Sequence, residues 1–141
     1  MEDGFNLERF VAAQDADACY ARAVTELRLG HKASHWMWFV FPQIAGLGQS
    51  EMSRRFAISS LEEARAYLRH GTLGPRLQEC TTIILGQSDR TAEEIFGRLD
   101  AHKLRSSMTL FMRAAPGDGH FRRVLDQYFC GMPDTETDDR I

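Results

Sequence analysis

Signals that start and stop helices recur at short intervals along this chain, and the apolar residues between them repeat with a helical period. Ser60 followed by Glu63, and Thr91 followed by Glu94, have the spacing of a capping box, in which side chains and backbone amides satisfy each other at a helix start. Near the end of the chain, an apolar stripe typical of a core-facing helix stops at Gly131. These patterns predict an all-α, compact multihelical domain of about seven or eight short helices.

Length and composition favour a single domain. The 141 residues are 43% hydrophobic and 26% charged, a balance that can bury a core. No repeat or low-complexity segment divides the chain, so residues 6–131 are expected to form one domain, and the polar, acidic residues 132–141 a flexible tail. An α+β fold with a small sheet is the alternative, because residues 36–41 and 81–85 are rich in aromatic and β-branched residues.

Charge and cysteine usage narrow the function classes. A formal net charge of -3 gives no footprint for binding nucleic acid or an anionic membrane surface, so neither partner is expected. Cys19, Cys80 and Cys130 are far apart, which predicts reduced thiols and neither a disulfide framework nor a zinc site. The acidic N-terminus lacks a secretory signal and no apolar run could span a membrane. The expected compartment is the cytoplasm, and no cofactor is predicted.

Residues 34–43, the aromatic segment, combine five large apolar side chains with a histidine near the start and a glutamine at the end. One interpretation is a central core helix, since aromatic residues bury large apolar areas. However, Trp36 and Trp38 point to different faces of a helix and cannot both be core. The functional interpretation is that one of them forms a flat wall for a planar ligand, with His35 and Gln43 nearby.

A metal site is not predicted. His31 and His35 have the four-residue spacing of a helical metal pair. However, Lys32 stands where a zinc peptidase motif needs a glutamate, and Gly30 interrupts the helix. No third ligand is apparent.

Residues 46–55, the glycine segment, place Gly46 and Gly48 before an expected helix start. Exposed backbone amides there, with Arg54, would suit an anion. The segment lacks the third glycine of a dinucleotide fingerprint and the lysine of a P-loop, so a plain turn is the alternative.

Residues 102–109, the hydroxyl segment, carry Ser106, Ser107 and a threonine on an expected helix. Because these residues are mediocre helix formers, their density calls for a reason. Close helix packing or solvation is one, and binding of a phosphate or carboxylate by Lys103 and the hydroxyls is the other. Hydrolysis would need His35 or an acidic residue within hydrogen-bond reach of a serine. No G-x-S-x-G elbow is present, so no nucleophile is assigned.

Residues 6–14, 34–43, 46–48, 73–77 and 103–111 resemble a bacterial family catalogued as domain of unknown function 1810. The resemblance spans nearly the whole chain, and the aromatic segment is specific to this family. It implies a small multihelical cytoplasmic protein, like the mycobacterial protein that typifies the fold, without an established activity or catalytic residues. Members often carry the label calpastatin, but that inhibitor is a disordered repeat protein, unlike a chain with these apolar stripes.

Two hypotheses follow from these segments. The leading one is a binding module, or an enzyme, for a small anionic ligand such as a nucleotide derivative. The rival is a structural or protein-interaction domain without a small-molecule site. Convergence of the aromatic, glycine and hydroxyl segments around one concave site would favour the first, and the oligomeric state is left open. The ligand-binding residues predicted from sequence are His35, Trp36, Trp38, Gln43, Arg54, Lys103, Ser106 and Ser107.

Overall fold

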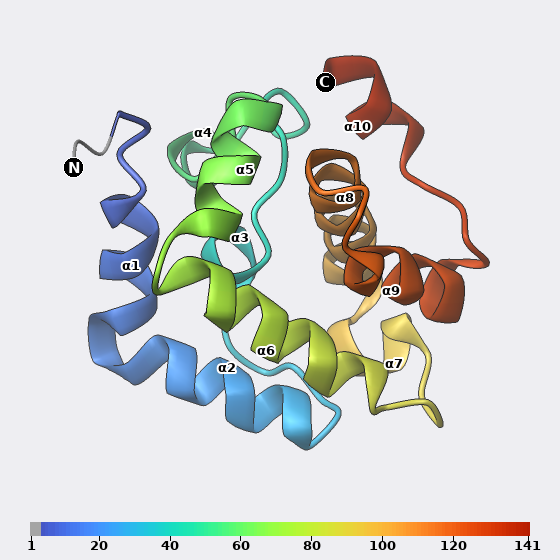
Figure 1. Cartoon of the computed structure of the whole chain (residues 1–141). Helices are drawn as coiled ribbons and strands as arrows, with labels where there is room; N and C mark the ends of the chain where they lie inside the picture. The colour runs from blue at the N-terminus through green and yellow to red at the C-terminus, as the bar shows by residue number, and fades with distance from the viewer. Residues whose placement is uncertain (1–3) are drawn as a thin grey trace.

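The computed structural model describes residues 4–141, and they form an all-α domain (Figure 1). Residues 1–3, whose acidic side chains counted against a secretory signal, lie outside the described residues. Within 4–141 the only β pairing is one bridge between Ile44 and Ile58, so the all-α prediction is confirmed and the α+β alternative is wrong. No helix in this range has the length and apolarity that crossing a bilayer requires. The helices are α1 (Glu8–Asp15), η1 (Ala16–Ala18), α2 (Cys19–Arg28), α3 (Met37–Val40), α4 (Glu51–Arg55), α5 (Leu61–Arg69), α6 (Leu73–Leu85), α7 (Ala92–Phe96), α8 (Arg98–Ala114), α9 (Gly119–Phe129) and α10 (Thr135–Arg140).

The longest helix, α8, organises the packing, because it contacts α5, α7, α9 and α10. Its Leu104, Met108 and Phe111 are fully buried, at the spacing that places side chains on one helix face. On the other side of the molecule, α2 packs on α6, and α6 in turn contacts α5 and α9 (Figure 1). One face of α8 therefore lies in the core, and a different face is left for a site.

A chain of aromatic rings connects the helices through the core. The ring of Phe10 on α1 lies 5.2 Å from that of Tyr67 on α5. Tyr67 lies 5.4 Å from Phe111 on α8, which lies 5.7 Å from Phe121 on α9. All four side chains are fully buried. Ring pairs at these separations add to the stabilisation from burial, so these rings fix α8 against α5 and α9 and connect α1 to them through Tyr67.

The two predicted capping boxes behave differently. Thr91 and Glu94 form the complete box at the start of α7. The Ser60 hydroxyl also accepts the expected bond from the backbone N–H of Glu63, but the Glu63 carboxylate does not return to Ser60. It accepts instead from the backbone N–H of Ser59 at 2.8 Å and from the Arg9 guanidinium at 2.9 Å. The second half of that box is wrong because tertiary and neighbouring donors compete for the same carboxylate.

The aromatic segment is mostly buried, but only Met37–Val40 form a helix, the single turn α3. Trp36 is fully buried, whereas Trp38 is half-buried. The prediction that the two tryptophans cannot both be core is therefore confirmed. A long central helix over this segment is wrong, because the backbone leaves helical geometry at Phe41 and pairs at Ile44 with the chain before α5.

The C-terminal residues 132–141, expected from composition to be a flexible tail, include α10, which packs on α8. Asp134 and Thr137 are buried at this contact. The Arg113 guanidinium adds two hydrogen bonds to the Asp138 carboxylate, at 2.9 and 3.0 Å. These contacts place α10 beside α8, where its Glu136 lines a cleft.

Candidate functional site

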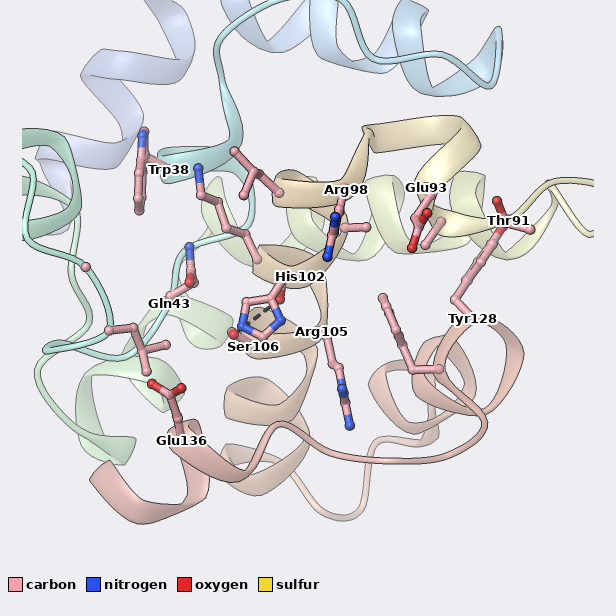
Figure 2. A pocket seen from close by; sticks show the side chains of 17 residues that line it. Trp38, Gln43, Thr91, Glu93, Arg98, His102, Arg105, Ser106, Tyr128 and Glu136 are labelled. Atoms are coloured by element: carbon pink, nitrogen blue, oxygen red, sulfur yellow. Dashed lines mark hydrogen bonds between the residues drawn. The ribbon is translucent and has the colours of Figure 1, made fainter.

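A cleft of about 890 Å³ runs along the outer face of α8 (Figure 2). Two neighbouring rows of α8 face it, one starting at Arg98 and the other at Leu99, each continued at helical spacing. The remaining walls come from the aromatic segment, the glycine segment, α7, the end of α9 and α10. Its lining residues are Trp38, Gln43, Leu47, Gly48, Thr91, Ala92, Glu93, Arg98, Leu99, Ala101, His102, Lys103, Arg105, Ser106, Tyr128, Phe129 and Glu136.

The three segments singled out from the sequence meet in this cleft. The aromatic segment contributes Trp38 and Gln43, the glycine segment contributes Leu47 and Gly48, and the hydroxyl segment contributes Lys103 among others. These segments are separated by up to half of the chain and converge only because α8 packs beside the aromatic segment. Four of the predicted ligand residues line the cleft, namely Trp38, Gln43, Lys103 and Ser106. The other four, His35, Trp36, Arg54 and Ser107, do not.

Lys103 is fixed at the Trp38 end of the cleft. Its ammonium lies 4.1 Å from the centroid of the Trp38 ring, within the range of a cation–π interaction. It also lies 3.3 Å from the Asp100 carboxylate, one turn earlier on α8. The same carboxylate holds Lys32 at 2.7 Å. The Lys103 side chain stays 25% exposed, so its position is restricted while further donor capacity faces the cleft.

Gln43 lines the cleft with a buried amide nitrogen that lacks a hydrogen-bond partner within the described part of the chain. Its side chain is only 9% exposed, and its Nε2 has no hydrogen-bond partner among residues 4–141. The backbone is held in place because the Gln43 carbonyl accepts from the N–H of Ile58 at 2.8 Å, next to the β-bridge. An unpaired buried amide costs about 1–3 kcal/mol. Figure 2 shows the Gln43 amide on the same side of the cleft as Trp38.

The glycine segment approaches the cleft through tight packing. A Cβ added at Gly48 would lie 2.8 Å from the Ser53 side chain and 3.7 Å from Cη2 of Trp38. Gly46 adopts a φ of +96°, which favours glycine. Arg54, predicted as an anion ligand, is exposed, and its guanidinium donates to the Gln49 carbonyl outside the cleft. The glycines therefore allow the loop to close against Trp38.

The hydroxyl segment already binds a carboxylate, that of Asp134 just before α10. The Ser106 hydroxyl donates to Asp134 at 3.1 Å, and the Thr109 hydroxyl accepts from the Asp134 backbone N–H at 2.8 Å. Asp134 also accepts from the Thr137 hydroxyl at 2.7 Å and caps α10. These bonds explain the density of hydroxyls on α8 through close packing. Ser107 is fully buried, and its Oγ has no partner among residues 4–141.

The same cluster bears on the hydrolysis hypothesis. An acidic residue, Asp134, does lie within hydrogen-bond reach of Ser106. His102 lies with its Nε2 3.9 Å from the Asp134 carboxylate, beyond hydrogen-bond distance. In a serine hydrolase the serine donates to a histidine that the acid orients, whereas here the serine donates directly to the acid. These hydrogen bonds hold the start of α10 against α8 and do not form a catalytic triad.

Trp36 belongs to a separate buried cluster. Its indole N–H donates to the Glu26 carboxylate at 2.9 Å, which also accepts from the backbone N–H groups of Ala33 and Ser34. Burial by itself raises the pKa of Glu26, but a hydrogen bond from the Ser34 hydroxyl, together with those from the two backbone N–H groups and the indole, outweighs burial and lowers it from 4.5 to about 2. His35 is exposed beside this cluster and does not reach the cleft. No group of three or more potential metal-ligating side chains occurs within 4–141.

Several lining residues were not predicted as ligands. Arg98, His102 and Arg105 form the row of α8 that starts at Arg98, and their spacing of four and three residues is visible in the sequence. Tyr128 and Phe129 end the apolar stripe of α9, which favours a core position, but both are half-buried and line the cleft. An apolar stripe shows which side chains share one face of a helix. It does not show whether the neighbouring helices extend far enough to cover the last residues of that face.

The charge of the lining differs from that of the chain. Three cationic side chains, Arg98, Lys103 and Arg105, face two acidic ones, Glu93 and Glu136. The whole chain has a formal net charge of -3. The lining by itself has one more cationic than acidic side chain, and Asp100 pairs with Lys103 at its edge.

Comparisons with known proteins agree with this description. The family described as protein of unknown function (DUF1810) matches residues 4–141. The crystal structure of the conserved hypothetical protein Rv1873 from Mycobacterium tuberculosis superimposes with a TM-score of 0.92 at 52% identity, over 96% of this chain and 95% of that one. Among proteins with curated descriptions, none matches. A match along all described residues and a shared fold at this identity lead to one conclusion: the chain belongs to the DUF1810 family of proteins of unknown function.

Proposed function

We propose that this protein binds a small anionic ligand in the cleft along α8. The observation that carries the proposal is the pairing of two donors at one end of the cleft: the fixed ammonium of Lys103 and the unpartnered, buried amide nitrogen of Gln43. Both groups are donors of the kind that the oxygens of a phosphate or carboxylate accept from. Binding would then offset the cost of leaving the Gln43 amide unpaired.

The size and charge of the cleft support a small molecule as the ligand. Ligand pockets usually enclose about 300–1,000 Å³ and combine apolar walls with a few polar groups. This cleft, at about 890 Å³, has Trp38, Tyr128 and Phe129 as apolar walls. Its lining has one more cationic than acidic side chain, whereas the whole chain has a net charge of -3, so attraction of an anion would be local. The proposal concerns binding and does not require turnover.

We also propose the cytoplasm as the compartment. Cys19, Cys80 and Cys130 are all free thiols in the structure, and Cys130 is exposed. Unpaired exposed thiols are typical of reducing compartments.

The test is isothermal titration of the full chain with inorganic pyrophosphate and with nucleoside monophosphates, at ionic strength matched by sodium chloride. We expect saturable binding, and a loss of about tenfold in pyrophosphate affinity for Lys103→Met, because hydrogen bonds to charged groups are worth more than neutral ones. Arg122→Met, which removes an equal charge from an exposed site on α9, is the matched control and should bind as the wild type does.

Two results would overturn the proposal. One is the absence of saturable binding for every anion tested, and this would favour the structural or interaction role. The other is equal pyrophosphate affinity for wild type and Lys103→Met, with both proteins folded by circular dichroism.

A further inference from the structure

We propose that the ligand is an amino-substituted aromatic ring joined to its anionic group, with the anion at Lys103 and Gln43 and the ring against Tyr128 and Phe129. This inference rests on the proposed function and states which part of the ligand lies at each end of the same cleft. Four features carry it: the contacts of Trp38, the exposure of the two rings on α9, the polar groups between the two ends, and the carboxylate of Glu93.

Trp38 does not offer a vacant stacking surface. The Lys103 ammonium lies over its ring at 4.1 Å, and Asp100 holds that ammonium from α8. A ligand ring stacking on this face would have to displace the cation from both partners. The Trp38 end therefore suits an anionic group that contacts Lys103 where it lies, and Trp38 acts as its platform.

Tyr128 and Phe129 provide the vacant aromatic surface. Both are half-buried and line the cleft, and neither contacts another aromatic ring within residues 4–141. The Tyr128 hydroxyl can donate its one proton to either the Ile84 carbonyl or the Gln87 carbonyl, the latter at 3.0 Å, which restricts rotation of the ring. Figure 2 shows Tyr128 at the opposite end of the cleft from Trp38. A fixed, half-exposed ring of this kind is suited to stacking.

The groups between the ends fit a polar linker. Figure 2 shows Arg98, His102 and Arg105 between Trp38 and Tyr128, all on α8. At about 890 Å³ the cleft has room for a ring, a polar linker and an anion. A sugar carrying a phosphate has the chemistry of such a linker.

The carboxylate of Glu93 indicates which substituent the aromatic ring of the ligand carries. Its exposed side chain lies at the Tyr128 end of the cleft and forms no ion pair within the described residues (Figure 2). A carboxylate only accepts hydrogen bonds at neutral pH, so the complementary group on the ring is an N–H donor. An exocyclic amino group meets this requirement, whereas a ring carbonyl does not.

The experiment compares three probes by isothermal titration: AMP, purine riboside 5′-monophosphate, which has a hydrogen in place of the amino group, and ribose 5-phosphate, which has no aromatic base. We expect AMP to bind about tenfold more tightly than ribose 5-phosphate, as stacking of one base on an aromatic side chain supplies. Phe129→Leu should bring AMP down to the ribose 5-phosphate affinity and leave ribose 5-phosphate itself unchanged. Phe5→Leu, an exposed aromatic position away from the cleft, is the control.

The preference for AMP over purine riboside 5′-monophosphate should be about fivefold and should disappear in Glu93→Ala, which removes the acceptor for the amino group. Equal affinities of AMP and ribose 5-phosphate would overturn the inference while leaving the anion-binding function intact. An AMP preference that survives Phe129→Leu would overturn the placement of the ring. Failure of all three probes and of pyrophosphate would overturn the proposed function itself.

Discussion

Trp36 and Trp38 stand two residues apart, yet they serve two different regions of the molecule. Trp36 is fully buried, and its indole N–H is paired with Glu26. Trp38 is half-buried and lines the cleft. Each ring has a lysine over it, Lys32 at 5.0 Å and Lys103 at 4.1 Å.

The difference lies in what surrounds each pair. Lys32 is 7% exposed, whereas Lys103 is 25% exposed and faces the cleft. Asp100 binds both ammonium groups and so connects the two regions. The same pair of residue types therefore stabilises the fold in one place and prepares a binding surface in the other. Exposure, more than chemistry, decides between these roles.

The largest expected contrast is in stability. Trp36→Ala should lower the free energy of unfolding by about 3–5 kcal/mol, since it leaves a large cavity and removes a donor from Glu26. Trp38→Ala should cost less than half as much, because its ring is partly solvated already. Urea unfolding followed by far-UV circular dichroism measures both. Equal losses for the two variants would contradict the division of roles.

The Trp36 region should also give a specific pH dependence through Glu26. Its folded-state pKa of about 2 lies below the ordinary 4.5, so between these values the unfolded state binds more protons. The stabilisation is fully present above pH 4.5 and is lost as the pH falls through 2, and it amounts to about 3 kcal/mol.

Glu26→Gln removes this titration, so its unfolding free energy should fall less than that of the wild type over the same pH range. Stability measured by urea unfolding at intervals from pH 6 to pH 2 tests the difference in slope. Parallel curves for the two proteins would show that other carboxylates account for the acid sensitivity.

The smallest expected effect tests the connection between the regions. Asp100→Asn leaves the buried Lys32 ammonium without its carboxylate and should lower stability by about 1–2 kcal/mol. It also removes a negative charge beside Lys103, so pyrophosphate should bind a few-fold more tightly at low salt. Calorimetry and urea unfolding on one preparation measure both effects. If stability falls while pyrophosphate affinity is unchanged, Asp100 serves the Trp36 region alone.

Local signals predicted helix boundaries well where no distant group competed for them. The Thr91 box formed in full, whereas the carboxylate of Glu63 was taken by Ser59 and by Arg9 from α1. Capping depends on residues three positions apart, so sequence can propose it. A competing donor more than fifty positions away cannot be inferred from spacing.

The site was predicted in part for a similar reason. The aromatic, glycine and hydroxyl segments were each visible as unusual compositions, and each contributes to the cleft. Tyr128 and Phe129 looked like the end of a core stripe, and Glu136 belonged to a polar tail. Their part in the cleft depends on where α9 ends relative to α8 and on the docking of α10.

The sequence by itself determined the all-α fold, the apolar faces of its helices and the three segments that meet in the cleft, since period, capping and composition act within a few residues. Tertiary structure alone decided which tryptophan is core, which hydroxyls are satisfied by Asp134 and which amide, that of Gln43, is left unpaired. The physical reason is that burial and hydrogen-bond satisfaction are properties of neighbours in space. Those neighbours are set by how α8 packs, which no local pattern encodes.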